Sequence, residues 1–192
     1  MSNNKQEKIK FSKAFWVANT VELFERAAYY GVFIVITLYL SRILGFNDIQ
    51  AASIAGIFSA CLYLLPTFAG ALADKIGFRN SMLIAFALLT MGYAGLAVYP
   101  TWLESAGLVS YSATTTFTGL LESNLQYGIL PIMALIVCGG AFIKSVISGT
   151  VAKETTPETR AKGFSIFYAM VNIGAFSGKT IVKPLREALG NE

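Results

Sequence analysis

The sequence predicts an all-α membrane protein, because few of its residues are charged and its apolar residues fall into runs long enough to span a bilayer. Of its 192 residues, 55% are hydrophobic and only 14% are charged, whereas an average soluble domain has about 25% charged residues. A helix needs roughly 20 mainly apolar residues to cross a bilayer. Five such runs are present, at residues 15–40, 51–73, 81–99, 127–150 and 164–185.

These five runs are expected to be helices, because they lack the alternation of apolar and polar residues that membrane strands show. The run at 164–185 is the least hydrophobic of them. Residues 1–14 form a polar tail, and residues 15–192 are expected to form one helical bundle. Connections are expected at 42–50, 74–80 and 151–163, with a longer loop, rich in Ser and Thr, at 100–126.

The positive charges predict a cytoplasmic amino terminus. Nine of them flank the runs on one side, namely Lys5, Lys8, Lys10, Lys13, Lys75, Arg79, Lys153, Arg160 and Lys162. The opposite connections carry Arg42 between the first two runs and no Lys or Arg at 100–126. Cytoplasmic loops are the ones enriched in Lys and Arg. Lys179, Lys183 and Arg186 depart from this pattern, since they would lie near the outer face.

The residue content also excludes several kinds of function. The chain has no histidine, which rules out histidine metal sites, Ser-His-Asp triads and histidine proton relays. Cys61 and Cys138 both fall inside apolar runs without a partner at motif spacing. No nucleotide-binding glycine pattern is present, and the placement of the net charge of +4 indicates membrane topology rather than nucleic acid. Because the chain has no histidine, any proton chemistry must use carboxylates.

Three charged residues lie inside the first run. The uncharged stretch Ala27–Leu40 is only about 21 Å long as a helix, too short to cross a bilayer core, so the helix must begin upstream, near Phe15. A charge at the resulting depth costs several kcal/mol unless it is paired or hydrated. Glu22 and Arg26 have the i, i+4 spacing at which an ion pair can close. Helical spacing predicts one polar stripe of Glu22, Glu25, Arg26, Tyr29 and Phe33.

A further charge, Lys144, lies inside the fourth run. It comes six residues before the expected helix end at Thr150, which places it about 9 Å from the cytoplasmic side, at a depth similar to that of Glu22 and Glu25. Two carboxylates and two cations would sum to zero charge, and a proton on one carboxylate would weaken a pair. Such an element can couple protonation to a conformational change. The alternative is that all four charges snorkel at interfacial helix ends.

The motif Glu-x-x-Glu-Arg followed by Tyr-Tyr-Gly resembles the first-helix motif of the proton-coupled oligopeptide transporters, a family of the major facilitator superfamily. The similarity covers residues 15–176. Lys144 matches the family's fourth-helix lysine, Tyr63 a pocket tyrosine, and Asn172, within Gly163–Ala175, the asparagine of its second signature. The turn after the second run is similar to the superfamily's loop motif, with Gly70, Asp74, Lys75, Gly77 and Arg79.

The resemblance implies a symporter that takes up di- or tripeptides with protons across the cytoplasmic (inner) membrane. The proton gradient would drive it, without a cofactor or metal. Glu22, Glu25, Arg26 and Lys144 would couple the proton. The substrate would contact Arg26, Tyr29, Tyr30, Tyr63, Lys144 and Asn172. The loop motif would latch helices. A charged turn that obeys the positive-inside rule explains Lys75 and Arg79 equally well, but it does not explain the spacing of the glycines and Asp74.

The sequence departs from the family at three places. Lys179 and Lys183 stand where the family is usually apolar, and of the three alternatives, pocket residues, lipid contacts and solvated helix ends, we expect the last. The family usually has an arginine shortly after Tyr-Tyr-Gly, where this chain has Val32, Phe33 and Ile34. It commonly has a proline after the fourth-helix lysine, where this chain has Ser145.

The number of runs predicts part of a larger assembly. Halves of this superfamily have six helices, and two halves enclose the binding site, so five runs are expected to be part of the amino-terminal half of a longer transporter. The missing half would be a partner. Two alternatives remain, a related carrier for another small solute and a half-length membrane subunit without transport. An enzyme is least expected, because no nucleophile or metal cluster is arranged for reaction.

Overall fold

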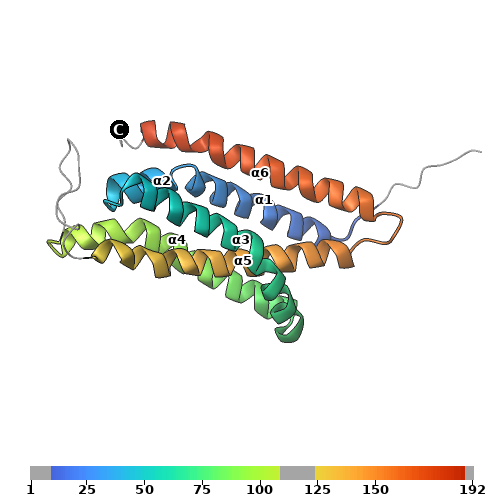
Figure 1. The fold of residues 1–192 in the computed structure, drawn as a ribbon. Coiled ribbons are helices and arrows are strands. Elements are labelled where there is room, and N and C mark those ends of the chain that lie inside the picture. The colour runs from blue at the N-terminus through green and yellow to red at the C-terminus, as the bar shows by residue number, and fades with distance from the viewer. Residues whose placement is uncertain (1–9, 109–123, 189–192) are drawn as a thin grey trace, which may run out of the picture. The chain divides into compact units, whose positions relative to one another are not determined.

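The computed structural model describes residues 10–108 and 124–188, and the regular elements of this part are all helices (Figure 1). Most of the Ser- and Thr-rich loop predicted at 100–126 lies outside the described residues. The elements in chain order are α1 (Lys13–Phe33), α2 (Ile36–Leu38), the π-helix η1 (Tyr39–Ile43), α3 (Asp48–Ile76), α4 (Phe78–Ser105), the 3₁₀-helix η2 (Leu125–Gly128), α5 (Ile129–Lys153) and α6 (Arg160–Ala188). All five predicted runs are helical.

The lengths and composition of these helices are those of a multi-pass membrane protein. Among the described residues, three helices are long and apolar enough to cross a bilayer, Asp48–Ile76, Phe78–Ser105 and Leu125–Lys153. Lys13–Phe33 and Ile36–Ile43 together make a fourth candidate. The prediction of an all-α membrane protein is therefore confirmed. Helix α6 has 29 residues but is not among these candidates, so the fifth crossing stays a prediction.

The first predicted run is a broken helix rather than a straight one. Its two parts meet at an angle of 42°. At the break, Val35 has φ −109° and ψ −4°, and its N–H donates to the carbonyl oxygen of Val32 at 3.1 Å, a three-residue spacing that tightens the turn. Residues 32–37 include several β-branched side chains directly after Gly31, and both features weaken an α-helix. This break was not predicted from the sequence.

The chain divides into two compact units, which we describe separately. The first comprises the chain up to Gly31 and from Ile147 onward, and the second is Val32–Val146. In the first unit α1 and α6 run side by side in the same direction. A Cβ at Gly174 would overlap the carbonyl oxygen of Leu23, and one at Gly178 would overlap that of Ala27. The two backbones are thus in close contact.

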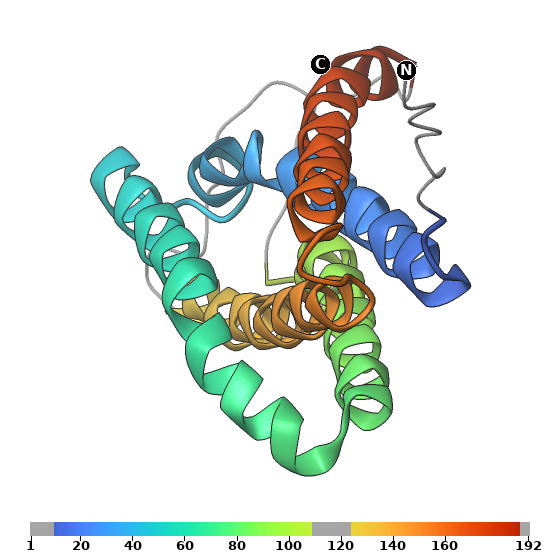
Figure 2. The ribbon, with the colours of Figure 1, turned by 90° about the vertical axis from the view of Figure 1, so that its right-hand side faces the viewer.

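The second unit contains the hairpin of α3 and α4, joined by a single residue, Gly77 (Figure 2). Its φ of +88° lies in the region that glycine adopts at no steric cost. Helix α5 packs antiparallel to α4, again through glycines. A Cβ at Gly139 would lie 3.0 Å from the carbonyl oxygen of Ala85, and one at Gly92 would overlap the side chain of Ile136. Small residues at such positions let membrane helices approach closely.

The start of α3 is a capping box. The side chain of Asn47 accepts a hydrogen bond from the N–H of Gln50 at 2.8 Å, and the Gln50 side chain accepts one from the N–H of Asn47 at 3.2 Å. These bonds satisfy two of the backbone donors that a helix start leaves free. The turn before α3 therefore ends at a defined residue.

Candidate functional site

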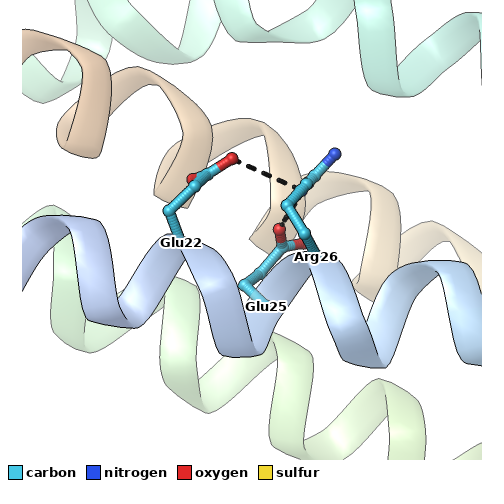
Figure 3. A network of polar contacts seen from close by, with 3 residues as sticks. All are labelled: Glu22, Glu25 and Arg26. Carbon is cyan, nitrogen blue, oxygen red and sulfur yellow. Dashed lines mark hydrogen bonds and ion pairs between the residues drawn. The ribbon is translucent and has the colours of Figure 1, made fainter. Parts of the chain in front are cut away.

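A buried ionic cluster lies on α1, where the stripe of polar residues was predicted. Arg26 Nε lies 3.4 Å from Glu22 Oε1, and the guanidinium also donates to Glu25 Oε2 at 2.5 Å (Figure 3). The exposed fractions of Glu22, Glu25 and Arg26 are 1%, 8% and 7%. The ion pair predicted between Glu22 and Arg26 therefore forms. Side chains that snorkel to an interface would be exposed, whereas these three side chains are buried.

The three residues of this cluster carry a formal charge of −1 when both carboxylates are ionised. A proton on either carboxylate makes the three residues neutral, and it weakens the attraction of that carboxylate for Arg26.

Each of the two tyrosines that follow this cluster has a cationic side chain over its ring. The rings of Tyr29 and Tyr30 meet edge to face, with centroids 5.0 Å apart. The guanidinium carbon of Arg26 lies 5.1 Å from the centroid of Tyr29, and Lys179 Nζ lies 4.8 Å from that of Tyr30. Tyr29 is buried and Tyr30 half-buried. Aromatic faces attract cations at such distances.

Asn172 lies on α6, in the same unit as the ionic cluster, and its side chain is exposed. It is on a different face from Gly174, which packs against α1, because a spacing of two positions turns the helix by about 200°. Lys179 follows Asn172 by seven residues and so lies on its face, two turns further along. Asn172, predicted to bind substrate, is thus available to a ligand.

Lys144 and Tyr63, two further predicted site residues, pair with each other in the second unit. Lys144 Nζ lies 4.5 Å from the ring centroid of Tyr63, which joins α5 to α3. The residue after Lys144 strengthens this junction, since Ser145 Oγ donates to the carbonyl oxygen of Pro66 at 2.6 Å. The hydroxyl at the position where the resemblance would place a proline therefore holds Lys144 beside Tyr63.

The loop motif lies at the turn between α3 and α4. Asp74, Lys75, Gly77 and Arg79 are exposed, and Gly70 faces Ser145 of α5, whose Cβ is 3.7 Å from a Cβ built on that glycine. Within the described residues Asp74, Lys75 and Arg79 take part in no ion pair. The latch role of this motif stays a prediction, and the conformation of Gly77 explains the glycine at that position.

Two features were missed by the sequence analysis. Asn19 is fully buried, and its amide group donates to the carbonyl oxygen of Phe15 at 2.8 Å. It precedes Glu22 by three residues, so the helical spacing that grouped the charged residues could have included it. The contact of Lys179 with Tyr30 was also not specified, because solvated helix ends were expected for Lys179 and Lys183 over the alternatives of pocket residues and lipid contacts. Lys183, in contrast, lies 3.9 Å from Glu187 in an exposed pair.

Comparison with known proteins gives a consistent set of relatives, although no family model matches the chain. The dipeptide and tripeptide permease A of Salmonella typhimurium is 30% identical over 172 residues, which is 87% of this chain. The proteins of the same name from Escherichia coli and Yersinia pestis are 29% identical over 171 residues and 27% identical over 186. The chain is a homologue of these peptide permeases.

The match to the peptide permeases is confined to one part of them. The chain spans only 29% of the length of the Salmonella typhimurium and Escherichia coli relatives and 32% of the Yersinia pestis one, and it matches their amino-terminal part. This agrees with the predicted resemblance to the amino-terminal half of a peptide transporter. Permeases are transporters and not enzymes, which also agrees with the sequence analysis.

Proposed function

We propose that this chain is the amino-terminal part of a proton-coupled symporter that takes up di- and tripeptides across the cytoplasmic membrane. The observation that carries the proposal is the buried pair of carboxylates, Glu22 and Glu25, that share Arg26 as an ion-pair partner, in a homologue of dipeptide and tripeptide permeases. A proton on either carboxylate would weaken its ion pair with Arg26.

In the proposed mechanism Glu22 and Glu25 hold the proton, while Arg26 moves between the carboxylates and the peptide. When a carboxylate is protonated its attraction for Arg26 falls, which frees the guanidinium for the negatively charged end of a peptide. Lys144 is the second cation of the proposal, and it would likewise exchange partners. Tyr29, Tyr30, Tyr63 and Asn172 would line the peptide site. The driving force is the proton gradient, in which each pH unit corresponds to about 1.4 kcal/mol.

The parallel course of α1 and α6 supports the proposed topology. Three crossings between them, by α3, α4 and α5, return the chain to the same side, so a fifth crossing has to run in the direction of the first. The backbone contacts between α1 and α6 have this direction. With the positive-inside pattern, this supports a cytoplasmic amino terminus and α6 as a membrane span. A second half, as in the longer relatives, would complete the transporter.

The test is uptake of a radiolabelled dipeptide by cells that express the complete gene, with and without an imposed pH gradient. Lys144→Ala is expected to abolish accumulation driven by the gradient, because the charge exchange loses one cation. Lys162→Ala, which removes an exposed lysine before the predicted fifth span, is the matched control and should behave as the parent. If Lys144→Ala still concentrates the dipeptide at the parental rate, the coupling mechanism is wrong. If the parent takes up no peptide, the function is wrong.

A further inference from the structure

Lys179 is a cation without a carboxylate partner among the described residues. Arg26, which lies on the neighbouring helix, has two carboxylates within ion-pair distance. Lys183, four residues after Lys179, has Glu187. The described contact of Lys179 is the ring of Tyr30, 4.8 Å from its Nζ. A cation–π contact attracts the ammonium group without neutralising it, so the positive charge of Lys179 stays available to an anion.

The surroundings of Lys179 are those of the proposed peptide site. Its ammonium group is level with Tyr30, one helical turn from Arg26, or about 6 Å along the α1 axis. Along α6 it shares a face with Asn172. Helix α1 itself supplies no cation beyond Tyr30, since Val32, Phe33 and Ile34 follow. Lys179 therefore brings a positive charge to the end of the tyrosine pair that α1 leaves uncharged.

The backbone contact between α1 and α6 fixes this arrangement. Gly178, the residue before Lys179, packs against the backbone of Ala27, and Gly31 faces the carbonyl oxygen of Gly178 at 3.4 Å from its built Cβ. The two backbones are in contact on both sides of Tyr30, so a shift of α6 alone does not separate Lys179 from the tyrosine. The fold thus fixes the backbone of Lys179 beside Tyr30, and the lysine side chain reaches the ring from there.

We propose that Lys179 binds a carboxylate of the transported solute, with Tyr30 holding the ammonium group in place. This inference rests on the proposed function, and it adds a residue to the peptide site. The carboxylate can be the carboxyl terminus of the peptide or an acidic side chain. A single charge-assisted contact of an exposed lysine is worth about fivefold to tenfold in affinity.

The experiment measures inhibition constants of unlabelled peptides against uptake of a labelled dipeptide, in cells expressing the complete gene. Two peptide pairs separate the sources of the carboxylate, Ala-Ala against its carboxyl-terminal amide and Ala-Glu against Ala-Gln. In Lys179→Met the member that carries the recognised carboxylate should bind about fivefold to tenfold more weakly, while its neutral counterpart is unchanged. Lys179→Arg should retain the parental values, because it keeps the charge.

Lys183→Met is the matched control, since it removes a lysine of the same helix that already has a carboxylate partner. It should leave every inhibition constant unchanged. An equal loss for charged and neutral peptides in Lys179→Met, which is the pattern of a lipid contact or a structural role, would overturn the proposal. The same loss in Lys183→Met would also overturn it. If the parent takes up none of the peptides, the proposed function fails first, and this inference fails with it.

Discussion

The close contact of α1 and α6 predicts that a single methyl group at Gly178 separates them. A Cβ built on Gly178 would overlap the carbonyl oxygen of Ala27 and lie 2.9 Å from its carbonyl carbon and Cα. All three atoms belong to the backbone, so no side chain can rotate away to make room. Gly178→Ala therefore forces one helix to shift relative to the other.

The size of this effect follows from two opposed contributions. Glycine to alanine in a helix interior stabilises by about 1 kcal/mol through propensity, whereas overpacking of a close contact costs about 1–3 kcal/mol. Gly56, inside α3, has no heavy atom within 4 Å of its built Cβ, so Gly56→Ala shows the first contribution alone. The two variants should differ by about 1–3 kcal/mol in the free energy of unfolding, with Gly178→Ala the less stable.

Thermal unfolding of the purified protein in detergent measures this difference. For a chain of this length, 1 kcal/mol shifts the midpoint by about 2–4 °C, so Gly178→Ala should unfold roughly 2–12 °C below Gly56→Ala. Tryptophan fluorescence is a suitable probe, because Trp16 lies on α1 itself. Equal midpoints for the two variants would refute the backbone contact of α1 and α6.

Two further predictions concern the buried polar contacts. Arg26→Ala removes the cation that pairs with two buried carboxylates, so it should lower the free energy of unfolding by about 3–5 kcal/mol and abolish uptake. Adding Glu22→Gln and Glu25→Gln should recover the folded yield in size-exclusion profiles without recovering uptake. Failure to recover the yield would contradict the charge argument. Ser145→Ala removes the hydrogen bond to Pro66 and should lower the free energy of unfolding by about 0.5–1.5 kcal/mol, measured by thermal unfolding. Ser165→Ala is the control and should lower it clearly less, because the Ser165 hydroxyl bonds within its own exposed helix turn. Similar losses of stability in both variants would show that the bond to Pro66 adds nothing.

The positions of the helices could be predicted from the sequence, because the apolar runs follow directly from bilayer thickness. The helix ends could not, since α4 continues to Ser105 and α6 begins at Arg160, in stretches whose polar residues read equally well as loops. The break at Val35 was missed for a related reason. Hydropathy is uniform across residues 32–40, whereas the break depends on backbone conformation, for which Gly31 and the β-branched residues gave only a weak signal.

The site was predicted where its residues lie close together along one helix. Glu22 and Arg26 are four residues apart, so helical geometry alone is enough to pair them. The partners of Lys144 and Lys179 lie on other helices, Tyr63 and Tyr30, and no spacing along the chain specifies such pairs. The carbonyl oxygen of Pro66, which accepts from Ser145, is a backbone atom and leaves no trace in the residue types.

The glycine contact between α1 and α6 keeps these two helices at a constant spacing. Arg26 and Lys179 are attached to two backbones that touch at Gly174 and Gly178, so the fold sets the distance between their Cα atoms. Each side chain can still change its partner over this fixed backbone distance. In the transport cycle proposed above, the helix movements would then have to occur at other contacts, while α1 and α6 move together.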